Sequence, residues 1–543
     1  MKLSRFITTD GFLLCAIGAL ISGVFMIYNQ AHSSAYTSGR QTSPAGSANQ
    51  SASSNTSPST SAVSSTSSTS GTSASPASLP STPTGAGSTP EAQLAAAYAA
   101  YNGRNYALAR SLFESMAGAG NREAERMLGW MYYVGDGVSL DYDKAYSLSR
   151  KAADQGDPYA MVNLGVMYDS GTGRPKDDKQ AFDLYREAAD TGNPNGQYCL
   201  ANFYANGRAV TQDLAKAAEL YRKSADQSFA SAQYSLGYLY ANGSGVKQDY
   251  DEAEVWYRKA ANAGNMDAQF ELGNLYDQGN GVEKDVLKAT DWYQKAADQG
   301  QSTAQAYLGD YYREGSDKIP QDYAKALSYY RKSAAANYSG AQYCLGLMYA
   351  EGEGVTQDYG EARLWYLKAA EQNQPDAEVA LGFLYYNGFG VQQNFDKASS
   401  WFQKAADLNN AEAFAGLGNL YYDGSGVKQN FETAASWYHK AGDDLTDCEA
   451  CYNLAMLYLD GKGGVKQDAA TSALWFRKAA DNNDPMAQYQ LGLLYEEGKG
   501  VKKDAAEALT WFQKSAALEN KDAIAHLEKI APGSKGRATK KKP

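Results

Sequence analysis

Histidine is scarce in this chain, with only three in 543 residues. They are His32, His439 and His526, and none has a second candidate ligand nearby at metal-binding spacing. Histidine and cysteine also form no cluster with the spacing of a zinc site. This shortage argues against a metalloenzyme, and we expect no bound metal, no cofactor and no catalytic residues.

Positive charge is also in short supply. Lys and Arg together number 50 against 61 Asp and Glu, which gives a formal net charge of −11. Nucleic acids attract proteins mainly through their phosphates, so an acidic chain is a poor candidate for non-specific binding to them. We therefore expect no nucleic-acid partner.

A leucine recurs at steps of 36 or 37 residues over most of the chain. It stands at positions 128, 164, 200, 236, 272, 308, 345, 381, 417, 454 and 491, which defines eleven copies. A fixed period in this range predicts a solenoid of helix pairs in which each copy contacts only its neighbours. We therefore expect an all-α fold.

The residues around this anchor leucine have helical spacing. A tyrosine follows four residues later in every copy, and alanine stands four residues before the leucine in all but one. The residue after the leucine is glycine in nine copies and alanine in two, Ala201 and Ala455. A glycine inside a helix costs about 1 kcal/mol, so we expect a neighbouring group to approach too closely for a larger side chain. A second glycine, seven residues after the leucine, is expected to end this first helix.

A second helix is predicted after the loop of each copy. The loop ends in Asp in nine copies and in Asn394 and Asn430 in the other two, and both residue types cap helices well. Seven of the eight tryptophans then share one column: 256, 292, 365, 401, 437, 475 and 511. Leu148, Leu184, Leu220 and Tyr329 fill that column elsewhere. We expect this column to form the core between the two helices, with the recurrent tyrosine also buried.

The consensus AxxxLGxLYxxGxGVxQDYxKAxxWYxKAA resembles the SEL-like repeats, a branch of the tetratricopeptide-like solenoids. The resemblance covers Glu123 to about Asn520. It implies a right-handed α-α superhelix whose first helices line a concave surface. Relatives act in secretion, envelope assembly, host contact and protein quality control, and the sequence does not choose among these roles.

The segments outside the repeats complete the expected organisation. Residues 91–122 look like a capping helix pair before the eleven repeats at 123–518. Residues 519–531 look like a C-terminal capping helix, and 532–543 form a basic tail. Residues 29–90 are rich in Ser, Thr, Ala, Pro and Gly, and this composition predicts a disordered linker.

An 18-residue run without charge, Gly11–Tyr28, precedes that linker. As a helix it would measure roughly 27 Å, just enough to span a bilayer. We expect a transmembrane anchor in the cytoplasmic membrane, with residues 1–10 in the cytoplasm because of Lys2 and Arg5, and the repeats outside. The alternative is a signal peptide, with secretion after cleavage near Ser33-Ser34-Ala35.

Some cysteine-rich members of the family that the chain resembles are described as β-lactamases. Ser244-Gly-Val-Lys247 and Ser425-Gly-Val-Lys428 match the SxxK pattern of penicillin-recognising enzymes, but no SDN or KTG partner motif accompanies them. The chain also lacks the cysteine pairs that bridge the helices in those relatives. A bond between Cys448 and Cys451 is left open by the sequence.

Aromatic residues vary on the exposed side of the first helix, two before, two after and five after the leucine. This candidate groove comprises Trp130, Tyr198, Tyr234, Tyr238, Phe270, Tyr343, Phe383, Tyr386, Tyr422, Tyr452 and Tyr489. Aromatic side chains in a groove are typical binding anchors. Phe383 and Tyr386 depart most from the consensus, so we expect them to contribute little to the stack, whereas Tyr385 between them should be core.

These observations favour a non-catalytic, membrane-tethered scaffold that binds a protein or peptide partner in the concave groove outside the cytoplasmic membrane. Two alternatives stay open at this point: a β-lactamase-like hydrolase of the SEL-like repeat family, and an envelope-polysaccharide-binding protein. The oligomeric state is not indicated by the sequence.

Overall fold

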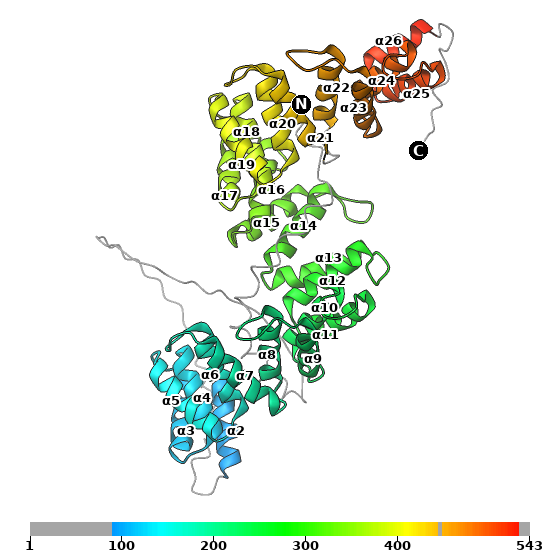
Figure 1. The fold of residues 1–543 in the computed structure, drawn as a ribbon. Coiled ribbons are helices and arrows are strands. Elements are labelled where there is room, and N and C mark those ends of the chain that lie inside the picture. The colour runs from blue at the N-terminus through cyan, green and yellow to red at the C-terminus, as the bar shows by residue number, and fades with distance from the viewer. Residues whose placement is uncertain (1–88, 444–447, 531–543) are drawn as a thin grey trace, which may run out of the picture. The chain divides into compact units, whose positions relative to one another are not determined.

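The computed structural model describes residues 89–443 and 448–530, which form 25 helices and no strand (Figure 1). The described chain falls into two compact units, divided between Lys284 and Asp285. The division lies between the two helices of the copy anchored at Leu272. The 25 helices of the described residues confirm the predicted all-α solenoid. The right-handed sense of its superhelix stays a prediction.

The N-terminal unit holds eleven helices. They are α2 (Pro90–Asn102), α3 (Tyr106–Gly118), α4 (Arg122–Val134), α5 (Tyr142–Asp154), α6 (Pro158–Ser170), α7 (Asp178–Asp190), α8 (Pro194–Asn206), α9 (Leu214–Ala225), α10 (Ala230–Asn242), α11 (Tyr250–Asn262) and α12 (Met266–Gln278). Helices α2 and α3 pack on each other, and α3 packs on α4, the first helix of the first repeat.

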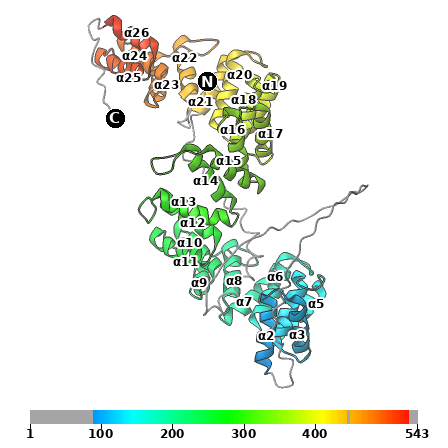
Figure 2. The same cartoon turned by 180° about the vertical axis from the view of Figure 1, so that it is seen from behind.

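The C-terminal unit holds the other fourteen helices (Figure 2). They are α13 (Val286–Asp298), α14 (Ser302–Glu314), α15 (Tyr323–Ala335), α16 (Ser339–Glu351), α17 (Tyr359–Ala370), α18 (Pro375–Asn387), α19 (Phe395–Asp407), α20 (Ala411–Asp423), α21 (Phe431–Asp443), α22 (Cys448–Asp460), α23 (Ala469–Asp481), α24 (Pro485–Glu497), α25 (Ala505–Ala517) and α26 (Lys521–Ile530).

The helix boundaries follow the predicted capping residues. In all eleven copies the Asp or Asn that ends the loop accepts a backbone N–H from the first turn of the second helix. Gly352, at the end of α16, has a φ of +76°, in the left-handed region that L side chains rarely adopt. Capping chemistry readable in the sequence therefore sets the length of each helix.

The core between the two helices of a copy is built by the residue after the tryptophan column. These side chains are all buried, and we call them the core aromatic column: Tyr185, Tyr221, Tyr257, Tyr293, Tyr330, Tyr366, Phe402, Tyr438, Phe476 and Phe512. A Cβ added to Gly309 would lie 2.5 Å from the Tyr330 ring, and one added to Gly382 would lie 2.5 Å from the Phe402 ring. An aromatic ring thus packs directly against the glycine after the anchor leucine, which confirms the predicted close approach.

The expectation that the tryptophans form this core is wrong for five of the seven. Trp292, Trp365, Trp401, Trp437 and Trp475 are only half-buried, while Trp256 and Trp511 are buried. Consecutive helical residues point about 100° apart, so the side chain after the tryptophan faces the first helix and the tryptophan lies to one side. A lysine three residues later covers the ring, as Lys368 covers Trp365 with its Nζ 3.9 Å from the ring centroid.

Glutamines join consecutive copies. Gln233 Nε2 donates to the carbonyl of Ala225 at 3.1 Å, and Gln488 Nε2 donates to that of Ala480 at 3.0 Å. Each bond gives a carbonyl in the last turn of one second helix a second donor from the first helix of the next copy, since that carbonyl also accepts the backbone N–H three residues later. The same bond recurs from Gln269 and Gln305. Repeat-to-repeat stacking is therefore fixed by buried polar contacts as well as by apolar packing.

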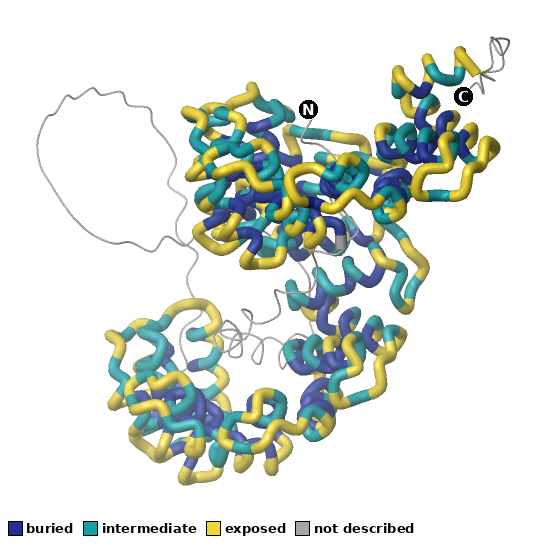
Figure 3. Tube along the Cα trace, turned by 45° about the horizontal axis from the view of Figure 1, so that its top comes forward, coloured by how far each residue is buried: buried dark blue, intermediate teal, exposed yellow. Residues whose placement is uncertain are grey.

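The first helices form the inner layer of each unit. Helices α4 and α6 and helices α6 and α8 approach each other in the N-terminal unit, and α18, α20 and α22 do so in the C-terminal unit. Among the described residues no two second helices approach as closely. Figure 3 shows buried residues along the helices and exposed ones at their loops. The side on which consecutive first helices approach each other, where the candidate groove residues lie, is called the inner face below.

The predicted anchor at 11–28 lies outside the described residues, as do the basic tail at 532–543 and the linker at 29–90 apart from its last two residues. Within 89–443 and 448–530, no helix combines the length and the apolar character needed to cross a membrane. The membrane anchor and the linker stay predictions.

Candidate partner-binding surface

The structure places ten of the eleven candidate groove residues in half-buried positions on first helices. Those of the N-terminal unit are Trp130 on α4, Tyr198 on α8, Tyr234 on α10 and Phe270 on α12. Those of the C-terminal unit are Tyr343 on α16, Phe383 and Tyr386 on α18, Tyr422 on α20, Tyr452 on α22 and Tyr489 on α24. The eleventh, Tyr238 on α10, is 37% exposed. The candidates thus share one kind of position, with one edge in the protein and one in solvent.

Five of the tyrosines two residues before the leucine have a structural role. Each ring packs against the core aromatic column of its own copy, as Tyr343 does on Tyr366 with a centroid distance of 5.8 Å. The other pairs are Tyr198–Tyr221, Tyr234–Tyr257, Tyr452–Phe476 and Tyr489–Phe512, at 5.6 to 5.9 Å. These rings extend the core toward the inner face, and a partner would meet only their outer edges.

Phe383 and Tyr386 are also part of the stack, so the expectation that they contribute little to it is wrong. The Phe383 ring packs edge-to-face on Phe402 at 5.1 Å, and the Tyr386 ring packs on Phe395 at 5.5 Å. Tyr385, predicted to be core, is half-buried, with the Lys397 Nζ 5.0 Å from its ring centroid. Phe383, Tyr385 and Tyr386 are thus all half-buried, a similarity that the spacing pattern did not predict.

The Tyr386 hydroxyl links two copies. It donates to the Asp423 carboxylate on α20 at 2.8 Å. Burial, together with the charge of Asp423 and that of Glu449 on α22, raises the pKa of Tyr386. Three consecutive first helices therefore contribute an aromatic ring, a carboxylate bonded to its hydroxyl and a second carboxylate within electrostatic range, which together suit a cationic group.

Two carboxyl groups of the first helix α12 are desolvated, unlike the capping carboxyl groups at the ends of the loops. Burial raises the pKa of Asp267 and Glu271 on α12. By contrast, backbone N–H groups hold the pKa of the cap residues Asp285 and Asp322 below its ordinary value. A positively charged neighbour would therefore stabilise the ionised forms of Asp267 and Glu271.

Asp310 on α14 is an inner-face group that sequence reasoning missed. It accepts a hydrogen bond from the Tyr330 hydroxyl at 2.6 Å, and the Cys344 Sγ lies 3.9 Å away. Burial raises its pKa to about 6. Arg313, one turn along, pairs with Glu353 at 2.6 Å and Glu351 at 3.9 Å. The only signal in the sequence was a carboxylate where other copies have an apolar or amide side chain.

The residues suggested by the SxxK pattern lie in ordinary repeat loops. Ser244 and Lys247 follow α10, and Ser425 and Lys428 follow α20, with both lysines exposed. In the part of the chain that the structure describes, no three His, Cys, Asp or Glu side chains are grouped to hold a metal. Cys448 and Cys451 carry thiols rather than a disulfide.

The comparison with known proteins follows the repeat pattern. The Sel1 repeat matches residues 122–157, 158–193, 194–229, 230–265, 267–301, 302–338, 339–374, 375–410, 411–444, 448–484 and 485–520. No curated protein matches the chain.

The solved structures that are similar to the chain include two Sel1-type repeat proteins. The first is c5321, a protective antigen of uropathogenic Escherichia coli strains that displays an SLR fold. It is 34% identical, covers 78% of this chain and 90% of its own, and has a TM-score of 0.64. The second, a Sel1 repeat protein from Oxalobacter formigenes, is 37% identical over 46% of this chain and 100% of its own, with a TM-score of 0.43. With eleven matched segments along its length, the chain belongs to the Sel1 repeat family.

Proposed function

We propose that this protein is a non-catalytic scaffold that binds a basic protein or peptide segment along the inner face of its first helices. The observation that carries the proposal is the contact between Tyr386 and Asp423, where an aromatic ring and a carboxylate from consecutive copies meet at a half-exposed position. An aromatic ring beside a carboxylate can bind a Lys or Arg side chain of the partner. The ring contacts the aliphatic part of that side chain, and the carboxylate pairs with its charged group.

The repeat architecture supports a segment as the ligand. Each first helix contributes the same few inner positions, so a row of similar sites follows the stack at the spacing of the repeats. Solenoids offer extended surfaces of this kind rather than single deep pockets. The net charge of −11 favours a basic partner and adds long-range attraction to it.

The test is the binding of labelled 15-residue peptides to the full-length protein, with basic and acidic peptides matched in apolar content. Basic peptides should bind, and binding should weaken as salt rises. The double variant Asp423→Asn with Glu449→Gln removes two inner-face charges and keeps an acceptor for Tyr386. It should weaken binding roughly tenfold, since two exposed charge pairs at about 0.7 kcal/mol each add to about 1.4 kcal/mol.

The matched control is Asp396→Asn with Glu432→Gln, which makes the same change in charge on the exposed surface of the second helices α19 and α21. It should leave the affinity within a factor of about two. Equal loss in both double variants would show only a response to net charge, and tight binding of the acidic peptides would contradict the proposal outright.

The proposal includes a tether. Residues 11–28 would hold the protein in the cytoplasmic membrane, and residues 29–90 would form a flexible tether. Tethering would raise the local concentration of the binding surface near the membrane. The full-length protein should stay with membranes after an alkaline carbonate wash, and added protease should remove the repeats only from the outer side. A soluble mature form that begins near Tyr36 would instead show a cleaved signal peptide.

A further inference from the structure

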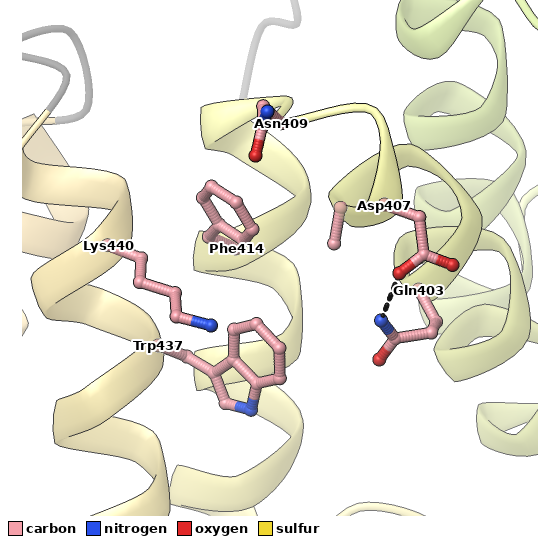
Figure 4. Close-up of a pocket in the computed structure, with 7 residues that line it drawn as sticks. Gln403, Asp407, Asn409, Phe414, Trp437 and Lys440 are labelled. Atoms are coloured by element: carbon pink, nitrogen blue, oxygen red, sulfur yellow. Dashed lines mark hydrogen bonds between the residues drawn. The ribbon is translucent and has the colours of Figure 1, made fainter.

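A cavity of about 440 Å³ opens between helices α19, α20 and α21 of the C-terminal unit (Figure 4). It lies at the ends of the second helices and is not part of the inner face. Its lining residues are Gln403, Ala406, Asp407, Asn409, Phe414, Trp437 and Lys440.

One wall of the cavity is aromatic. The Trp437 indole stacks on the Phe414 ring with a centroid distance of 5.9 Å and an angle of 20° between the planes. The Lys440 Nζ lies 4.3 Å from the indole centroid. Figure 4 shows Trp437 between Lys440 and the side of the cavity that carries Gln403. The indole therefore has a cation on one side and the cavity on the other.

The opposite wall is polar. Gln403 Nε2 donates to the Asp407 Oδ1 at 2.8 Å, and Asn409 lies at the loop end of the cavity. This bond holds the Gln403 amide against its own helix, so the amide does not fill the space in front of Trp437. A carboxylate and a carboxamide thus face an indole across an open cavity.

In other copies a side chain occupies the space that is open in front of Trp437, and we call these the filled copies. The position equivalent to Gln403 is arginine in six copies: Arg150, Arg186, Arg222, Arg258, Arg331 and Arg477. The Arg222 guanidinium lies 5.6 Å from the Trp256 ring, and the Arg477 guanidinium lies 5.5 Å from the Trp511 ring.

Both of these tryptophans carry a second cation as well. The Nζ of Lys259 is 3.7 Å from Trp256, and the Nζ of Lys514 is 3.8 Å from Trp511. An indole between an arginine and a lysine is therefore a recurring arrangement in this protein, and the lysine does not keep the arginine away. At Trp437 the lysine is present and the arginine is replaced by Gln403.

We propose that this cavity binds the guanidinium group of an arginine from a partner protein or peptide. The guanidinium would stack on the Trp437 indole and pair with the Asp407 carboxylate, reproducing from outside the arrangement that Arg222 and Arg477 make from within. The inference is independent of the inner-face proposal, because it concerns a different surface and different residues.

The chemistry favours arginine over lysine. A guanidinium is planar, so it can stack on an aromatic ring while its edge donates two hydrogen bonds to a carboxylate. In the filled copies the tryptophan Nε1 donates to Glu252 or Glu507, four residues earlier, and Glu507 also pairs with Arg477. The equivalent residue beside Trp437 is Thr433, so Asp407 is the carboxylate left to pair with the ligand.

The test uses the full-length protein labelled with 5-fluorotryptophan and a capped Gly-Arg-Gly peptide followed by ¹⁹F NMR. The Trp437→Leu variant assigns the Trp437 resonance, and leucine already stands in this column at 148, 184 and 220. The arginine peptide should shift the Trp437 resonance selectively and saturably. Matched peptides with citrulline or lysine should bind at least about fivefold more weakly.

Three variants complete the test. Gln403→Arg restores the residue found in the filled copies, so it should shift the Trp437 resonance without peptide and abolish the response to the peptide. Asp407→Asn should weaken binding about tenfold, and the inner-face variant Asp423→Asn with Glu449→Gln should leave it unchanged. The proposal is overturned if the citrulline peptide binds as well as the arginine peptide, or if the Gln403→Arg variant still responds like the wild type.

Discussion

Replacing Phe402 with alanine should lower the free energy of unfolding of the C-terminal unit by about 3–5 kcal/mol. Phe402 is fully buried, with the Phe383 ring at 5.1 Å and the backbone of Gly382 directly against its face. The backbone at Gly382 cannot move into the space left by the ring, so the substitution leaves a cavity between α18 and α19. In a chain that is stabilised mainly by neighbouring copies, such a mid-stack loss should also split unfolding into two steps.

Trp401 is the matched control, because it is the adjacent residue and the larger side chain. It is half-buried and covered by Lys404, whose Nζ lies 4.0 Å from its ring centroid. Trp401→Ala should therefore cost less, about 2 kcal/mol, since part of its surface stays in water in the folded protein. Denaturant unfolding followed by circular dichroism measures both. An equal or larger loss from Trp401→Ala would show that the core has been assigned to the wrong column.

Replacing Asp310 with asparagine should stabilise the protein near pH 7 and have little effect near pH 4. The pKa of Asp310 is about 6 in the folded protein, above its ordinary value of 3.8. As the pH rises between these values, the unfolded chain releases its proton while the folded protein keeps it. The contribution of Asp310 therefore opposes folding increasingly up to pH 6, by on the order of 3 kcal/mol in total.

The substitution is conservative because asparagine keeps the oxygen that accepts from Tyr330. The groups around Asp310 are Tyr330 on α15, Cys344 on α16, and Arg313 and Glu314 on its own helix. Urea unfolding of the wild type and the Asp310→Asn variant at several pH values between 4 and 7 gives the difference in their free energies of unfolding. The contributions of the other acidic groups are the same in both proteins and cancel in that difference. A difference that does not change with pH would contradict the raised pKa of Asp310.

Much of the fold could be predicted from the sequence because it rests on local chemistry that repeats. The 36- to 37-residue period, the Asp or Asn caps and the left-handed glycines each have one structural meaning. The sequence was less informative about which of two adjacent columns in the second helix forms the core. Trp401 and Phe402 are both large apolar residues, and spacing alone does not say which one faces the first helix.

The candidate sites were less accessible to sequence reasoning. The inner-face aromatic positions were identified, but their packing on the core aromatic column depends on distances between helices. Asp310 is a single departure from the repeat, whereas glutamine stands in the column of Gln403 also at 294 and 513. Neither residue has a clear meaning until the structure shows that Tyr330 bonds to Asp310 and that the cavity opens in front of Trp437.

The most direct test of the central claim is photo-crosslinking in the cells that make the protein. A photoreactive amino acid would replace either Tyr422, on the inner face of α20, or Leu474, which is 69% exposed on the second helix α23. The account predicts a discrete crosslinked partner from position 422 and none from 474, with the crosslink lost in the Asp423→Asn, Glu449→Gln background. A partner captured from position 474 but not from 422 would contradict the assignment of the inner face as the binding surface.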